Sequence, residues 1–214
     1  DIMMLDPVNN FIANNIMVHN SSGIKSLMKD MKPDNFEDIS ATIALYRPGP
    51  MGMESHTEYS RRKNGLHKTT YFHDDAQEAL SNTYGLTVYQ EQVMSIAQKF
   101  AGYTAAEADE LRKAMAKKIP EKMEEQRQKF IPAVAEYYPD EPQLGQDIWD
   151  IIAPFGAYSF NRSHSAAYGM LSYRTAWLKT HYPAQFAGAS IDYNMTSKDK
   201  IIDTVSWIKE MGVH

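Results

Sequence analysis

The chain has 214 residues, of which 43% are hydrophobic and 23% are charged, a balance typical of a globular protein with one large domain or two small ones. It contains no cysteine and no apolar run of roughly 18 residues, which excludes disulfides, thiolate metal sites and a helical membrane span, so we expect a cytoplasmic protein without a membrane partner. The formal net charge of −5 excludes a uniformly basic nucleic-acid wrapper but not a local basic groove.

The first 20 residues differ in composition from the rest of the chain. They are rich in Asn, Ile, Met and Val, contain no Lys, Arg or Glu, and carry turn signals at Asp6-Pro7 and Asn14-Asn15. We predict two short strands joined by turns, a β-hairpin-like segment that ends before position 21. The chain starts in mid-pattern at Asp1, without a helix cap or strand boundary, which indicates a fragment or a processed piece.

From position 21 onward, apolar residues recur three and four apart, the period of a helix, so we predict a mainly α-helical protein. Arg47-Pro-Gly-Pro50 is expected to end a first helix, and a second is expected to stop near Gly102. The capping box Thr104-Ala-Ala-Glu107 is expected to open a third helix and Pro120 a fourth. A brief strand is expected near 85–89. The predicted helices cover 36–46, 93–100, 104–118, 120–134, 144–152, 164–181 and 201–208.

His19-Asn20-Ser21 directly follows an apolar run and can cut the chain. The Asn20 side-chain amide can attack its own main-chain carbonyl, with His19 as the general acid that helps the amine leave. The Ser21 hydroxyl can accept an acyl group from an upstream segment. Taken alone, the tripeptide also fits an ordinary surface loop, because short motifs match by chance.

The surrounding sequence, DPVNNFIANNIMVHNS at 6–21, resembles the C-terminal end of an intein, the element that performs protein splicing. The resemblance implies that 1–20 is an intein segment and that His19, Asn20 and Ser21 are its splicing residues. This family often has histidine where Asn9 stands, so a group that assists acyl transfer is missing or replaced. The resemblance also implies that splicing requires the remainder of the intein, in the same chain or in another.

Four blocks follow Ser21 in the sequence: KPDNFEDISATIALYRPGPM, TYGLTVYQEQVMSIAQKFAGYT, ADELRKAMAKKIPEKM and FNRSHSAAYGMLSYRTAWLKTHYPAQF. Together, and in this order, they resemble the fingers region of the bacterial replicative DNA polymerase III alpha subunit. The resemblance implies that 21–214 is such a region and belongs to a DNA-directed DNA polymerase, which transfers nucleotides under the direction of a template.

The third block places Arg112, Lys113, Lys117 and Lys118 at the end of a helix that starts with acids. Such a pattern complements the helix dipole, for about 0.3–1 kcal/mol per charge. The dipole does not explain why Lys113 and Lys117 stand four residues apart, where like charges repel, and a nearby polyanion would relieve that repulsion. The resemblance implies that Arg112 and Lys113 bind the triphosphate of the incoming nucleotide. The family commonly has a glycine and a third lysine where this chain has Ala116 and Ile119.

The fourth block opens a helix with amide and hydroxyl side chains. Asn161 or Ser163 can cap that helix, and His164 also fits a buried structural histidine. The resemblance implies that Asn161, Arg162, Ser163 and His164 contact the sugar and phosphates of the nucleotide.

Other basic residues are candidates for contacts to the phosphates of DNA. Arg61 and Arg62 belong to a basic patch, and Lys117 and Lys118 are the further candidates. Arg47-Pro-Gly-Pro50 is either a rigid helix stop or a bend near the template. His67 and His73 lack the ligand spacing of a zinc site, and we predict no metal ligand in this chain.

The resemblance implies Mg²⁺ as the cofactor, held by palm-domain aspartates that lie outside this chain, so we expect the isolated chain to be inactive. The expected partners are template-primer DNA, deoxynucleoside triphosphates, the N-terminal remainder of polymerase and intein, and replisome subunits such as the sliding clamp. Two alternatives remain: a splicing precursor with a passive helical host segment, and a noncatalytic helical DNA-binding module.

Overall fold

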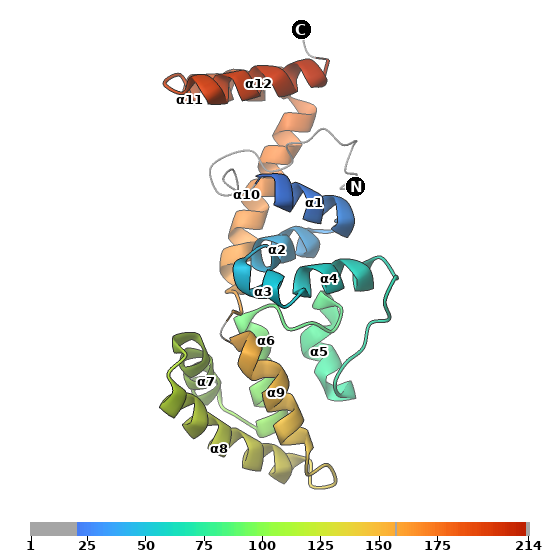
Figure 1. Ribbon diagram of the computed structural model, residues 1–214, viewed down its shortest axis with the longest axis vertical. Helices are drawn as coiled ribbons and strands as arrows, with labels where there is room; N and C mark the ends of the chain where they lie inside the picture. Colours follow the sequence, from blue (N-terminus) through green and yellow to red (C-terminus); the bar gives the residue numbers. More distant parts are fainter. Residues whose placement is uncertain (1–20, 157, 213–214) are drawn as a thin grey trace. The chain divides into compact units, whose positions relative to one another are not determined.

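The computed structural model describes residues 21–156 and 158–212, and this part of the chain is mainly helical, as predicted (Figure 1). Two 3₁₀ turns, η2 at Asp74–Ala76 and η3 at Ser81–Thr83, flank the short helix α5. The twelve α-helices of the described residues are α1 Ser21–Met31, α2 Phe36–Leu45, α3 Pro48–Gly52, α4 Ser55–Lys63, α5 Gln77–Leu80, α6 Gln90–Ala101, α7 Ala105–Lys117, α8 Pro120–Tyr137, α9 Leu144–Gly156, α10 Arg162–His181, α11 Pro183–Tyr193 and α12 Lys198–Glu210.

The strand expected near 85–89 does not form. The described residues contain no named strand, and only an isolated parallel bridge joins Tyr89 to Phe160. This connection is buried at Thr87, Val88 and Tyr89. β-branched and aromatic residues therefore occur here because the connection is buried, not because it pairs with another strand. The predicted hairpin at 1–20 lies outside the described residues.

The chain divides into two compact units. One comprises Ile43–Ser165, and the other comprises the residues up to Thr42 and from Ala166 onward. The division falls inside α2 and α10, two helices predicted from the sequence. The helical period therefore identifies α2 and α10 but does not show that each of them is shared between two units.

The proline pair at 48 and 50 both ends one helix and begins another. Helix α2 stops at Leu45, and Pro48 occupies the first turn of α3, where its missing N–H is not needed. Arg47, which precedes a proline, is extended with φ −147° and ψ 152°. The sequence predicted the stop but not the helix that follows, and the outcome is a fixed backbone direction at Arg47.

The predicted caps of α6, α7 and α8 are confirmed. Helix α6 ends at Gly102, which has a φ of 62°, and Pro120 lies in the first turn of α8. At α7, the Thr104 N–H donates to Glu107 Oε2 (2.9 Å), and the Glu107 N–H donates to Thr104 Oγ1 (3.3 Å). The Lys129 ammonium lies 2.8 Å from Glu107 Oε1. Hydrogen bonds from Lys129 and Thr104 lower the pKa of the Glu107 carboxyl to about 2. The cap at Thr104 fixes where α7 begins. The start of the helix in turn sets the positions of its cations, Arg112, Lys113 and Lys117.

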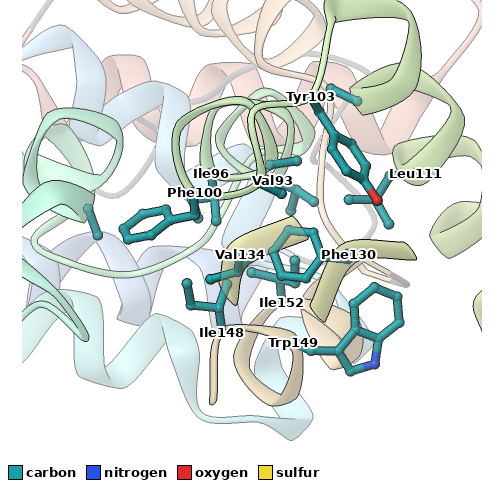
Figure 2. Close-up of a cluster of buried hydrophobic side chains, with 14 of the residues drawn as sticks. Val93, Ile96, Phe100, Tyr103, Leu111, Phe130, Val134, Ile148, Trp149 and Ile152 are labelled. Atoms are coloured by element: carbon teal, nitrogen blue, oxygen red, sulfur yellow. The ribbon is translucent and has the colours of Figure 1, made fainter. Parts of the chain in front are cut away.

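The larger unit, Ile43–Ser165, has a hydrophobic core formed mainly by α6, α7, α8 and α9. Figure 2 shows side chains of these helices converging around Phe130, which lies 5.8 Å from the ring of Trp149. Leu111 of α7 is fully buried in this core. It directly precedes Arg112, which is predicted to bind the nucleotide. Fully or nearly fully buried members include Leu80, Val93, Ile96, Ala97, Phe100, Ala108, Leu111, Met115, Phe130, Val134, Ile148 and Ile152.

The smaller unit contains α1, α11, α12 and parts of α2 and α10. Helices α11 and α12 pack against each other, and Trp207 of α12 is buried. The ammonium of Lys179 lies 4.1 Å from the centre of the Trp207 ring, and burial lowers the pKa of Lys179 to about 8. Within the described residues, no helix has the length and apolar character needed to cross a membrane.

Candidate functional site

An open pocket of about 400 Å³ lies in the larger unit, Ile43–Ser165. Its lining comes from three places in the sequence: the connection before α3, the first residue of α6, and the segment that leads into α10. The lining residues are Arg47, Gln90, Ser159, Phe160, Asn161 and His164. Asn161 and His164 were predicted as site residues, whereas Arg47 and Gln90 were not.

Two backbone hydrogen bonds hold the walls of the pocket together. The Phe160 N–H donates to Val88 O at 3.1 Å, and the Gln90 N–H donates to Phe160 O at 2.9 Å. These bonds join segments about 70 residues apart and form the isolated bridge at Tyr89. They place the start of α6 beside the entry to α10.

Phe160 is the aromatic element of the pocket. The Arg47 guanidinium lies over its ring at 4.8 Å, and the His164 ring meets it edge-on at 5.2 Å. Arg47 Nη1 also donates to Tyr158 O at 3.3 Å. A Cβ at Gly49 would overlap the Tyr158 ring, which explains the glycine between the two prolines. The pocket therefore presents a fixed cation against a flat apolar face.

Glu91 organises the N-terminus of α10. Its two carboxylate oxygens accept the Arg162 N–H at 3.1 and 3.0 Å, and Oε1 also accepts Asn161 Nδ2 at 2.9 Å. Asn161 Oδ1 in turn accepts the His164 N–H at 2.8 Å, so Asn161 caps the helix as the sequence allowed. Glu91 could not be predicted from the sequence, because a contact across 70 residues leaves no local signal.

Arg112 reaches the edge of the pocket from α7. Its Nη1 donates to Oε1 of Gln90 at 3.4 Å, while Nε and Nη2 lie 2.8 and 2.7 Å from Asp109 Oδ1. Lys113 Nζ lies 2.6 Å from Oδ2 of the same carboxylate. Hydrogen bonds from Lys113 and Arg112 lower the pKa of Asp109. Asp109 is thus an internal anion for Lys113, in place of the external polyanion that the sequence suggested.

The other residues predicted to bind the nucleotide lie near the pocket but do not line it. The Arg162 guanidinium is 5.7 Å from the centre of the Tyr89 ring. Ser163 and Lys113 are exposed, and neither is among the lining residues. Asn161 and His164 therefore line the pocket, Arg112 contacts its edge through Gln90, and Lys113 and Ser163 lie outside the lining.

The predicted DNA ligands occupy different environments. Arg62 makes structural contacts: its Nε lies 2.7 Å from Glu58, and its Nη1 donates to Tyr84 O and Thr70 O at 3.0 and 3.3 Å. Arg61 is exposed beside it on α4. Their proposed contacts to DNA remain predictions.

Lys117 and Lys118 stand where α7 ends. Lys118 has a left-handed backbone (φ 52°), and its Nζ lies 4.1 Å over the Tyr158 ring, whereas Lys117 is exposed. Of the predicted splicing residues, His19 and Asn20 lie outside the described residues, and Ser21 is the first residue of α1.

The pocket combines guanidinium and amide donors with an aromatic ring. Two guanidinium groups, Arg47 and Arg112, and the amide of Gln90 supply hydrogen-bond donors, and arginine's planar fork suits phosphate oxygens. Among residues 21–156 and 158–212, no three His, Cys, Asp or Glu side chains gather in a way that could hold a metal ion. The described residues therefore offer no set of side chains that would hold Mg²⁺ by itself.

Comparison with known proteins assigns the chain to a family. A family model described as the bacterial DNA polymerase III alpha subunit finger domain matches residues 13–137, a range that begins ahead of Ser21. DNA polymerase III subunit alpha of Pseudomonas aeruginosa is 45% identical over 196 residues, covering 89% of this chain and 17% of that protein.

The same subunit of Vibrio cholerae is 44% identical, and that of Escherichia coli 42%, each over 198 residues, 90% of this chain and 17% of the relative. The chain thus spans about a sixth of the length of these relatives. Because the matched family range covers more than half of the chain, the chain belongs to the family of bacterial DNA polymerase III alpha subunit finger domains.

Proposed function

We propose that this chain is the fingers portion of a replicative DNA-directed DNA polymerase and that its pocket binds the phosphates of an incoming deoxynucleoside triphosphate. The observation that carries the proposal is that two cations meet at this pocket: Arg47, from the α2–α3 connection, lies over Phe160, and Arg112, from α7, contacts Gln90. Family membership supports the same reading.

The residues of the pocket act by positioning and charge neutralisation. In phosphoryl transfer, charge spreads over the phosphate oxygens, and guanidinium donors stabilise it without exchanging a proton. Arg47 and Arg112 supply these donors, and Phe160 offers an apolar face beside them. Mg²⁺, when bound by aspartates elsewhere in the polymerase, would neutralise the triphosphate and polarise its oxygens. This division of labour requires the rest of the polymerase polypeptide.

The exposed cations outside the pocket are proposed to bind the template-primer DNA. Arg61, Lys117 and Lys118 are exposed, as phosphate-binding residues must be. Arg62 is assigned a lesser part, because its guanidinium is occupied by Glu58 and two carbonyls. Replisome subunits such as the sliding clamp remain expected partners of the whole polymerase.

A pair of arginine variants tests this assignment in primer extension, with the chain joined to the rest of the polymerase. Arg47→Ala is expected to raise the KM for the nucleotide roughly tenfold, because it removes a charge-assisted contact. Arg61→Ala is expected to leave that KM unchanged and to lower the slope of log affinity for DNA against log salt by about 0.9. If Arg47→Ala weakened only DNA binding, the noncatalytic DNA-binding module would be the better assignment.

We also propose, from the resemblance of 6–21 alone, that the chain carries an intein end that is removed at Asn20/Ser21. Asn20→Ala is expected to abolish cleavage at this bond when the complementary intein half is supplied, because alanine has no amide to close the ring. Asn10→Ala, in the same segment, serves as the matched control and should cleave normally. Mass spectrometry of the products reads out the result, and cleavage of Asn20→Ala at the wild-type rate would exclude the splicing role.

A further inference from the structure

One carboxylate holds both predicted triphosphate ligands of α7. Oδ1 of Asp109 accepts Nε and Nη2 of Arg112 at 2.8 and 2.7 Å, and Oδ2 lies 2.6 Å from Lys113 Nζ. Both oxygens of Asp109 are thus occupied, each by a different cation. Spacings of three and four residues on one helix make this arrangement possible.

The arrangement decides which end of the Arg112 guanidinium faces the pocket. With Nε and Nη2 taken by Asp109, Nη1 is the end that lies 3.4 Å from Gln90 Oε1. Gln90 lines the pocket, so the Nη1 end of the guanidinium lies at the edge of the pocket. An arginine side chain has many rotamers, and fixing one before a ligand arrives reduces the entropy that binding must overcome.

Two other readings of Asp109 lead to different results. If the contacts are ordinary surface ion pairs, they contribute little to any function, as exposed pairs usually do. If Asp109 competes with phosphate for the same donors, its removal would strengthen nucleotide binding. The geometry favours orientation, because Asp109 occupies the Nε edge of Arg112 and leaves the Nη1 end to the pocket.

We propose that Asp109 is a positioning residue that orients Arg112 toward the phosphates of the deoxynucleoside triphosphate. The inference rests on the proposed function of the pocket. Asp109 would not touch the nucleotide itself. It would hold the neighbouring Arg112 in the orientation in which it binds the phosphates. Lys113, held by the other oxygen, is kept on the same side of α7 as Arg112.

Primer extension by the polymerase polypeptide that contains this chain tests the proposal. The variants are Asp109→Ala, Asp109→Asn, Arg112→Ala and the double variant Asp109→Ala/Arg112→Ala. Asp109→Ala is expected to raise the KM for the nucleotide roughly tenfold with a smaller change in kcat, because a misoriented Arg112 would bind the nucleotide more weakly. Asp109→Asn retains Oδ1 as an acceptor and should recover part of the loss. In the Arg112→Ala background, Asp109→Ala should have no further effect.

Glu110→Ala is the matched control, because Glu110 is an exposed acid on the same helix and lies outside the pocket lining. It should leave KM and kcat at wild-type values. An unchanged or lowered KM in Asp109→Ala, together with a raised KM in Arg112→Ala, would overturn the role of Asp109 and leave the proposed function intact. An unchanged KM in Arg112→Ala would instead remove the proposed function and this inference with it.

Discussion

Replacing Leu111 with alanine is expected to lower the free energy of unfolding of the larger unit by about 2–5 kcal/mol. Leu111 is fully buried on α7, within the core that α6, α8 and α9 complete (Figure 2). Shortening it removes apolar contacts and leaves a cavity that the surrounding rings, such as Phe130, fill only in part. Because Leu111 adjoins Arg112, the same core that stabilises the unit also fixes the cation of the site.

Leu66→Ala is the matched control for this prediction, because Leu66 lies in the same unit but is 74% exposed. It should change the stability by no more than about 0.5 kcal/mol. Hydrogen exchange of amides in α6 to α9 reads the stability of this unit separately from the smaller one, which a global unfolding curve would mix. Equal losses for the two leucines would mean that α7 is not anchored by this core.

Replacing Arg112 with alanine is expected to raise the KM for deoxynucleoside triphosphate about 10- to 100-fold in the complete polymerase, since a hydrogen bond to a charged group contributes about 1.5–3 kcal/mol. The reason is local. Nη1 of Arg112 lies at Gln90, on the edge of the pocket, and no alanine side chain can reach that position. The measurement is steady-state primer extension at varied nucleotide concentration.

Arg127→Ala provides the control for Arg112→Ala. Arg127 belongs to α8, where it contacts Gln146 at 2.6 Å and Glu124 at 3.5 Å, and it does not line the pocket. Its loss removes the same charge from the same unit and should leave the nucleotide KM unchanged. A matching rise in both variants would indicate an effect of net charge alone.

Local signals in the sequence predicted much of the fold. The capping box at Thr104, the first-turn proline at Pro120 and the left-handed Gly102 lie where expected, because caps depend on residues within one turn of each other. Helix α4 was not predicted, because its sequence SHTEYSRRK is too polar to show an apolar period. Helices α1, α3, α5 and α11 were missed as well. Helices α3 and α5 have only five and four residues, too few to show a period, and α3 and α11 each start with a proline.

The site was predicted less completely than the fold. Asn161 and His164, identified through the resemblance, do line one pocket, and Arg112 contacts Gln90 at its edge. Nothing in the local sequence indicates that Arg47 joins them from 114 residues before Asn161. The partnership of Glu91 with Arg162 spans 71 residues and depends on how α6 and α10 meet. Asp109 is different: its spacing to Arg112 and Lys113 is a helical ion-pair pattern that could have been recognised from the sequence.

Titration calorimetry of the chain with a deoxynucleoside triphosphate and with the corresponding deoxynucleoside tests most directly whether the pocket binds phosphates. We expect the triphosphate to bind more tightly than the nucleoside, and Arg112→Ala to remove most of that difference while leaving nucleoside binding unchanged. Equal affinity for the two compounds, or a preference for the triphosphate that persists in Arg112→Ala, would contradict the account.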